Sequence, residues 1–249
     1  MFRSFKDLRG YRIHATDGNL GKVDDLLFDD LSWVIRYLVA DTGHWLPGRL
    51  VLLSPVSLQE PDFSSSALPV SLTSKQIEHS PSLSEHQPVS RRHERELVEY
   101  YEWPAYWADA FIPSFAGPAA TEAAAIERMR SEQRKVPEED VHLRSAREVR
   151  GYYIQADDGE IGHVDDFIVD TAAWRIRYAV IDTRNWWPGE RVLIAPRWID
   201  RIEWAQRKVF IEMTREMIRS CPPYDPSAPV NRQYEERLYD YYGRPKYWE

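Results

Sequence analysis

Residues 33–42 read WVIRYLVADT, and residues 174–183 read WRIRYAVIDT. From Trp33 to Val39, every second position holds the same apolar residue as its counterpart in the second stretch. Because strand side chains alternate between two faces, this spacing predicts a β-strand in each stretch, with the shared face in the core and the drifting face toward solvent or a neighbour. The shared residues are Trp33, Ile35, Tyr37 and Val39, with Trp174, Ile176, Tyr178 and Val180 as their counterparts.

The similarity extends far beyond these two strands, at a constant offset of 141 positions. Residues 8–107 align with residues 149–248 without an insertion or a deletion, and about 38 of the 100 paired positions are identical. A register that never slips over this length indicates a tandem duplication. We therefore expect three parts: a first repeat with a helical tail at 1–107, a linker with a helix at 108–148, and a second repeat with a helical tail at 149–249.

The pattern within each repeat predicts a mainly β fold with short C-terminal helices. An Asp-Gly pair at residues 17–18 recurs at 158–159 and is typical of a tight hairpin turn. Later in each repeat, Thr73 and Thr214 occupy positions suited to capping a short helix. Each repeat then ends in a short amphipathic helix followed by Pro-x-Tyr-Trp.

Composition excludes several classes of protein. With 32 Lys and Arg against 40 Asp and Glu, the formal net charge is −8, and neither repeat has the basic footprint that a phosphate backbone requires. No apolar run approaches the length of a membrane span, and the N-terminus lacks an apolar signal region, which indicates a cytoplasmic protein. The single cysteine, Cys221, excludes an intramolecular disulfide and a multi-thiolate zinc site.

Two features suggest metal sites at first reading. Asp-Asp doublets at residues 24–25 and 165–166 offer carboxylates, but adjacent strand residues point to opposite faces and cannot chelate as a pair. We expect one Asp of each doublet to meet Arg36 or Arg177 across the hairpin. Most histidines have no counterpart in the other repeat, so the three or four converging ligands of a zinc site are not expected.

The order of the shared motifs resembles that of the PRC-barrel domain. The motifs are Asp-Gly, Gly-x-Val-x-Asp, Trp-x-Ile-Arg-Tyr, Asp-Thr, Trp-x-Pro-Gly, Val-Leu-x-x-Pro and Thr-x-x-x-Ile. The PRC-barrel family includes the cytoplasmic domain of the photosynthetic reaction centre H subunit and a ribosome maturation factor. The resemblance covers residues 8–80 and 149–221, and it implies two small PRC-like β-barrels in tandem, joined by a partly helical linker.

The resemblance also implies assembly rather than catalysis, and it carries over no catalytic residues. We therefore expect a non-enzymatic protein–protein interaction or assembly adaptor that has a protein partner and needs no cofactor or metal. Two alternatives stay open. One is a small-molecule-binding or enzymatic module that uses a cleft between the barrels, and the other is a soluble relative of the reaction centre H subunit. Self-association into a homo-oligomer is also open.

Drift between the repeats suggests where a partner binds. The second repeat has gained Trp and Arg, the residue types enriched at binding hot spots, and both tails end in Trp, which we expect to anchor the tail on a barrel surface. Burial within the second repeat would explain the new tryptophans equally well. The candidate partner-binding residues are Trp187, Arg197, Trp198, Trp204, Arg207, Trp107 and Trp248.

Overall fold

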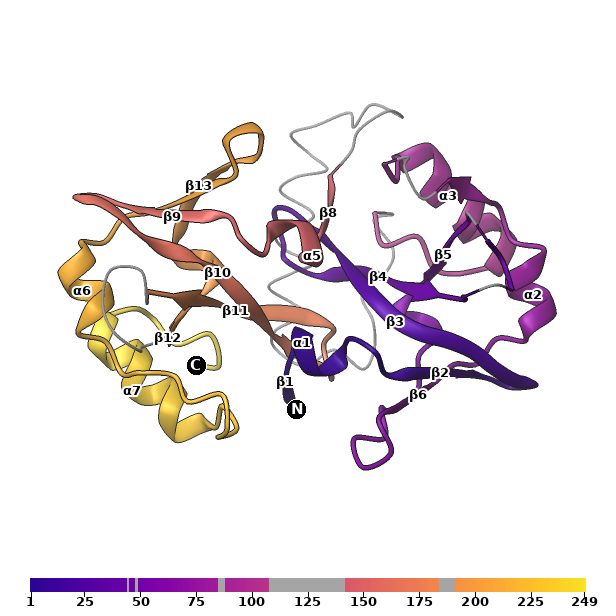
Figure 1. Ribbon diagram of the computed structural model, residues 1–249, viewed down its shortest axis with the longest axis horizontal. Coiled ribbons are helices and arrows are strands. Elements are labelled where there is room, and N and C mark those ends of the chain that lie inside the picture. Colours follow the sequence, from indigo (N-terminus) through magenta and orange to yellow (C-terminus); the bar gives the residue numbers. More distant parts are fainter. Residues whose placement is uncertain (44, 48, 85–87, 108–141, 184–190) are drawn as a thin grey trace. The chain divides into compact units, whose positions relative to one another are not determined.

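The chain folds into two compact units (Figure 1). The first-repeat unit is Asp7–Ser145, and the second-repeat unit combines Met1–Lys6 with Ala146–Glu249. A computed structural model describes residues 1–43, 45–47, 49–84, 88–107, 142–183 and 191–249. The predicted linker helix and Trp187 lie outside these residues.

The first-repeat unit contains a seven-stranded sheet with the order β6-β2-β3-β4-β5-β7, and β8 pairs with β3 beside this path. Its helices follow the predicted pattern, since Thr73 and Ser90 cap α2 and α3. The strands are β2 (Arg12–Ala15), β3 (Gly18–Asp29), β4 (Ile35–Asp41), β5 (Arg49–Leu53), β6 (Ala67–Pro69), β7 (Leu83–Ser84) and β8 (Leu143–Ser145), and the helices are η1 (Pro55–Ser57), α2 (Ser74–Glu78) and α3 (Arg91–Tyr101).

The second-repeat unit repeats this arrangement with the order β12-β11-β10-β9-β14-β13, and β1 pairs with β10 beside the path. Thr214 and Asn231 cap its two longer helices. The strands are β1 (Phe2–Ser4), β9 (Tyr153–Ala156), β10 (Gly159–Asp170), β11 (Arg175–Asp182), β12 (Arg191–Ile194), β13 (Ile199–Glu203) and β14 (Lys208–Ile211), and the helices are α5 (Ala146–Val149), η2 (Pro196–Trp198), η3 (Trp204–Gln206), α6 (Arg215–Arg219) and α7 (Arg232–Tyr242). The short helix α1 (Phe5–Leu8) contains the boundary between the two units, after Lys6.

Both sheets are open in their hydrogen-bonding order among the described residues. The terminal strands β12 and β13 of the second-repeat unit do not pair with each other, and neither do β6 and β7 of the first-repeat unit. The mainly β fold with short helices is therefore confirmed, whereas closure of each repeat into a barrel is not.

The shared face of the duplicated strand lies in the core as predicted. Tyr37 and Tyr178 are 2% and 0% exposed, and Ile35 and Ile176 are 1% exposed each. Trp174 is half-buried. Of the two surroundings expected for the opposite face, solvent or a neighbour, burial shows that several of its positions meet neighbouring residues. The buried residues on that face are Leu38, Ala40, Arg177, Ala179 and Ile181.

One glycine of each long strand is required by a close backbone approach. Gly21 in β3 and Gly162 in β10 have φ values of +146° and +147°. A Cβ atom at either position would lie 2.1 Å from the carbonyl oxygen of Asp41 or Asp182 on the neighbouring strand. These glycines therefore allow the long strand to bend beside its partner strand, which places both halves of that strand within the sheet.

Candidate functional site

The second-repeat unit is completed by a strand that precedes the first repeat in the chain. The strand β1 pairs antiparallel with the last part of β10, in the register Phe2 with Asp170, Arg3 with Val169 and Ser4 with Ile168. Two further bonds fix it, since the Ser4 hydroxyl and the Lys6 backbone N–H both donate to the Asp166 carboxylate. Residues 1–6 therefore contribute to the sheet of the other repeat.

The first-repeat unit is completed in the same way by β8, which directly precedes the second repeat. It pairs antiparallel with the last part of β3, in the register Leu143 with Asp29, Arg144 with Phe28 and Ser145 with Leu27. The Ser145 hydroxyl donates to Asp25, and Arg144 forms an ion pair of 3.2 Å with Asp30. Every paired position differs from its counterpart by 141, so the two repeats exchange equivalent strands.

These contacts correct the expected role of the Asp doublets. In the second-repeat unit Asp166 binds Ser4 of the incoming strand rather than Arg177, and in the first-repeat unit Asp25 binds Ser145. Burial raises the pKa of Asp166 above its ordinary value, although the Ser4 hydroxyl works in the opposite direction. Arg177 instead donates two bonds, of 3.1 and 3.2 Å, to Asp170 at the end of β10.

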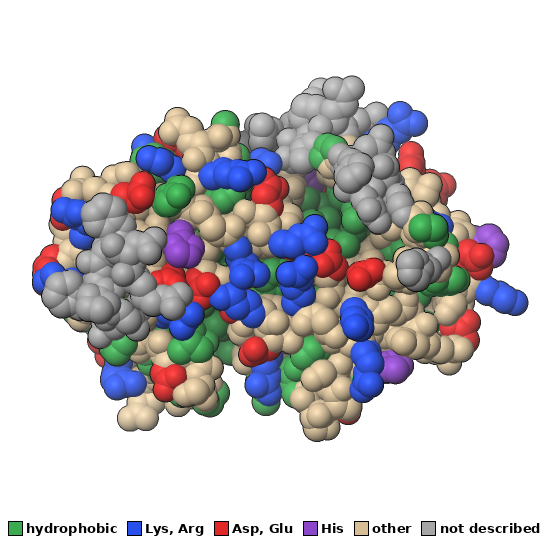
Figure 2. All heavy atoms as spheres, viewed as in Figure 1, with side chains coloured by type: hydrophobic (Ala, Val, Ile, Leu, Met, Phe, Trp, Pro, Cys, Tyr) green, Lys and Arg blue, Asp and Glu red, His purple; other side chains and the backbone are tan. Residues whose placement is uncertain are grey.

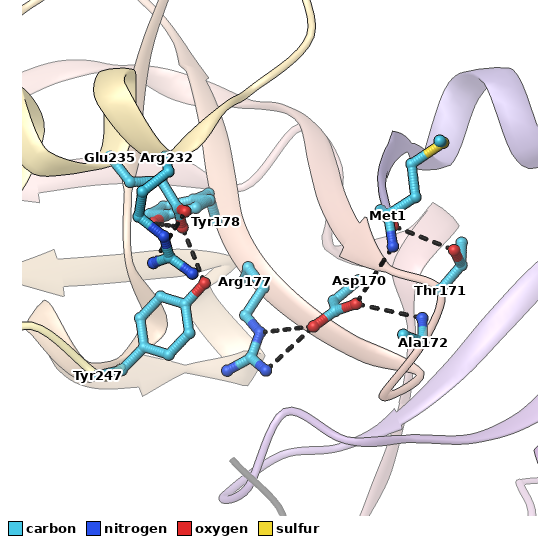
Figure 3. Close-up of polar contacts among 9 residues, drawn as sticks. All are labelled: Met1, Asp170, Thr171, Ala172, Arg177, Tyr178, Arg232, Glu235 and Tyr247. Carbon is cyan, nitrogen blue, oxygen red and sulfur yellow. Dashed lines mark hydrogen bonds and ion pairs between the residues drawn. The ribbon is translucent and has the colours of Figure 1, made fainter. Parts of the chain in front are cut away.

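A buried glutamate joins the tail of the second repeat to its sheet (Figure 3). Glu235 of α7 is 1% exposed and accepts hydrogen bonds from the hydroxyls of Tyr178, at 2.7 Å, and Tyr247, at 2.8 Å. Arg232, one helical turn earlier, forms an ion pair of 3.2 Å with the same carboxylate. The carboxylate therefore has both the hydrogen bonds and the opposite charge that a buried anion requires.

Figure 3 also shows how this tail site continues to the exchanged strand. The guanidinium of Arg177 lies 4.4 Å from the ring centroid of Tyr247 and donates to Asp170. The Asp170 carboxylate lies 3.8 Å from the amino group of Met1, and the Met1 carbonyl accepts two bonds from Thr171. One set of contacts therefore joins the tail, the sheet and the start of β1.

The first repeat has the equivalent glutamate with a different set of neighbours. Glu94 of α3 is fully buried and accepts a 2.6 Å hydrogen bond from Tyr106, and Arg91 lies 3.2 Å away. His142, which stands where the second repeat has Met1, lies 3.3 Å from the carboxylate. Burial raises the pKa of Glu94 to about 7, even though Arg91 and Tyr106 oppose the shift.

Both tail tryptophans pack on their own repeat. Trp107 lies under the guanidinium of Arg91, 4.4 Å from it, and Trp248 lies 3.9 Å from that of Arg232. Trp248 also contacts Tyr239 of α7 edge to face, at a centroid distance of 5.0 Å. Each Tyr-Trp tail is thus docked on the helix that precedes it.

The other predicted partner-binding residues are found in different environments. Trp198 is 3% exposed and packs against α7, so it is not available to a partner while this helix is docked. Arg197 is exposed, but its guanidinium donates to the Pro245 carbonyl of the tail, at 3.3 Å. Trp204 is half-buried against Tyr152, whereas Arg207 is exposed. Among the described residues of this set, Trp204 and Arg207 lie in one turn, whereas Arg197, Trp198 and Trp248 lie around the docked second tail.

One cluster of metal-ligand residues occurs within the described part of the chain. Side-chain ligand atoms of His163, Asp165 and Asp182 lie within 4.8 Å of one another. Asp165 already forms ion pairs with Lys6, at 2.6 Å, and Arg191, at 2.9 Å. Burial raises the pKa of Asp165, but these two cations outweigh it and hold that pKa below its ordinary value. The local charge is thus already balanced, which disfavours an added cation.

A cavity of about 310 Å³ lies on the second-repeat unit beside β13 and β14. Arg201 lines it, and this guanidinium lies 3.8 Å from the Phe210 ring centroid and 2.7 Å from Asp200. Arg201 and Asp200 in this cavity are therefore bound to each other. On the face drawn in Figure 2, acidic and basic side chains are interspersed on both units.

Sequence reasoning missed the two glutamates and the two serines. Arg91 and Glu94 of the amphipathic helix and Tyr106 of the tail are all identical in the second repeat, and this identity at polar positions was the available signal. Ser4 and Ser145 are also 141 positions apart, but they lie just before the aligned residues 8–107 and 149–248.

No helix in the described part of the chain combines the length and the apolar character needed to cross a membrane. A search of curated proteins found no match. The family model for the PRC-barrel domain matches residues 142–218, and it gives no second match over the first repeat. By this match, the chain contains a PRC-barrel domain over residues 142–218, which run from the residue before the exchanged strand β8 to α6 of the second repeat.

Proposed function

We propose that this protein is a non-enzymatic adaptor whose second repeat binds a protein partner. The PRC-barrel domain over residues 142–218 is compatible with a protein-interaction module. The proposal is supported most directly by the turn between β13 and β14, at residues 204–207. This turn presents an aromatic residue and an arginine at the surface of the matched domain.

The equivalent turns of the two repeats share a backbone but differ in their side chains. Arg207 and Ser66 both adopt the left-handed conformation, with φ values of 55° and 53°. In the first repeat, Asp62 accepts hydrogen bonds from the hydroxyls of Ser64 and Ser65, each at 2.6 Å, so the turn satisfies its own polar groups.

In the second repeat, the turn keeps its arginine available. Within the described part of the chain, the Arg207 side chain has no hydrogen bond or ion pair, and the neighbouring Trp204 keeps part of its ring exposed. Arginine and tryptophan combine directed polar contacts with apolar area, and they are over-represented at binding hot spots. The Arg207 side chain is therefore available to a partner, whereas the polar side chains of the first-repeat turn bind one another.

The test restores the first repeat's residues in this turn, with the double change Trp204→Phe and Arg207→Ser. Ser66 adopts the same left-handed conformation as Arg207, and Phe63 contacts Tyr11 edge to face as Trp204 contacts Tyr152, so both changes suit their sites. Partners captured from native lysate by the unchanged protein should bind the variant about 30-fold more weakly, the equivalent of about 2 kcal/mol. The melting temperature should change little.

A matched control is Arg92→Ser, which removes an exposed arginine from α3 of the first repeat. This variant should retain every partner. Retention of all partners by the turn variant as well would contradict the proposal, and it would assign Trp204 to packing against Tyr152 alone.

A further inference from the structure

The second-repeat unit has a site that one short segment of the chain fills. We call residues 1–6 the donor segment and residues 165–171, at the end of β10 and just after it, the acceptor site. The donor segment forms a three-residue antiparallel ladder on this site, and its serine and lysine bind the two adjacent aspartates, Asp165 and Asp166. Phe5 of the donor segment is fully buried, so the segment also completes the core of the unit.

One peptide bond connects the donor segment to the first-repeat unit. The boundary between the units falls between Lys6 and Asp7, within α1. The Lys6 backbone N–H donates to Asp166 of the acceptor site, whereas the Gly10 backbone N–H donates to Val23 of the first-repeat unit, at 2.8 Å. Every contact that residues 1–6 make with the acceptor site therefore lies on one side of this boundary. The segment would keep all of them on the identical acceptor site of a second molecule.

Each unit of this chain already accepts its extra strand from a different copy of the repeat. In the first-repeat unit, β8 fills the equivalent site at the end of β3, where the Ser145 hydroxyl donates to Asp25 in the same way. The two incoming strands read FRS and LRS, so they share the arginine and the serine. The acceptor site therefore binds a short strand of this chemistry that does not belong to its own repeat. A second copy of the chain supplies the identical strand.

We propose that the acceptor site also binds the donor segment of a second copy of this chain, so that two copies form a dimer by exchanging residues 1–6. In this dimer, each second-repeat unit contains β1 and the buried phenylalanine of the other copy. Because each copy gives one donor segment and accepts one, both acceptor sites are filled and the assembly closes at two copies. Exchange of an identical element is a low-cost route to a dimer, since the same contacts form in both states.

The covalent connections between the units determine the balance between monomer and dimer. Within one chain, the two units are joined at two places, between residues 6 and 7 and between residues 145 and 146. In the exchanged dimer, any two directly joined units share only one of these connections. The second connection holds the donor segment near its own acceptor site, at an effective concentration on the order of mM for a short tether, which favours the monomer in dilute solution. Shortening the first connection strains the monomer more than the dimer, because the monomer must satisfy both connections at once.

Mixed isotope labels test the proposal on the unchanged full chain. Two preparations with different labels are unfolded in urea, mixed, refolded at concentrations up to about 1 mM and separated by size exclusion. The share of dimer should rise with the protein concentration during refolding. In the dimer, filtered nuclear Overhauser effects should join Arg3 of one label to Val169 of the other. A protein that is monomeric at every concentration, or a dimer that lacks these contacts between labels, would overturn the proposal.

Two changes at the same connection shift the balance in opposite directions. Deletion of Asp7 should raise the share of dimer severalfold at a fixed protein concentration, because a short hinge under strain favours exchange. The matched control inserts a flexible Gly-Ser segment between Lys6 and Asp7, and it should lower the share of dimer by relieving that strain. The same share of dimer in all three proteins would also overturn the proposal, since exchange at this connection must respond to its length. If the deletion variant fails to fold, the experiment with mixed labels decides alone.

Discussion

The two units of this protein use the same strand exchange but secure it differently. In both units a three-residue strand from the other repeat pairs with the end of the longest strand, and a serine hydroxyl binds a buried aspartate. In the second-repeat unit, Arg177 donates to Asp170 beside the start of β1. In the first-repeat unit, His142, which directly precedes β8, lies 3.3 Å from the buried glutamate.

This difference shows which contacts belong to the duplicated design and which were added to one copy. The serine, the aspartate and the glutamate occur in both units. The serine and the aspartate hold the incoming strand, and the glutamate holds the tail. The imidazole occurs in one unit only. Its Nε2 lies 2.8 Å from the Tyr106 hydroxyl and 3.3 Å from the Glu94 carboxylate, whereas Met1 at the equivalent position has no polar side chain.

The largest expected effect comes from Phe5, which lies just after β1 and is fully buried. The change Phe5→Ala should lower the free energy of unfolding of the second-repeat unit by about 3–5 kcal/mol, the usual cost of removing a buried aromatic ring. Its counterpart Ala146 is also fully buried, so the ring is specific to one unit. Unit-resolved hydrogen exchange during urea unfolding measures the effect.

The Phe5→Ala change should also show which unit contains Phe5. Phe5 precedes the first repeat in sequence, yet it belongs to the second-repeat unit. The amides of β11 should therefore lose protection, while those of β4 should not. A loss confined to β4 would mean that residues 1–6 pack on their own repeat.

A smaller and symmetric effect is expected from the two serines. Ser4→Ala should destabilise the second-repeat unit and Ser145→Ala the first-repeat unit, each by about 1–3 kcal/mol, because a buried carboxylate loses a hydrogen-bond donor. The Ser4 hydroxyl opposes the effect of burial on the pKa of Asp166, so its removal should raise that pKa further. The penalty should shrink at low pH, where Asp166 is protonated and its charge no longer needs the donor. Equal effects of one serine on both units would contradict the exchange.

The sequence predicted the parts of the fold that depend on local pattern. The alternation in the duplicated strand identified the buried Ile35 and Ile176, and Thr73 and Thr214 cap short helices as expected. These features are set within a few residues by side-chain direction and by backbone hydrogen bonding.

The partners of each strand were not predictable in the same way. Residues 2–4 and 143–145 are too short to show a period, and nothing local indicates which long strand each one joins. The role of Glu94 was missed for a related reason. Its tyrosine, arginine and histidine partners come from separate segments of the chain, which only the fold brings together.

The exchange of strands is tested most directly by nuclear Overhauser effects between backbone protons in the unchanged full chain. The account predicts contacts of Arg3 with Val169 and Ser4 with Ile168, and contacts of Arg144 with Phe28. If each strand instead completed its own repeat, Arg3 would contact Phe28 and Arg144 would contact Val169. Observation of that second set would contradict the account.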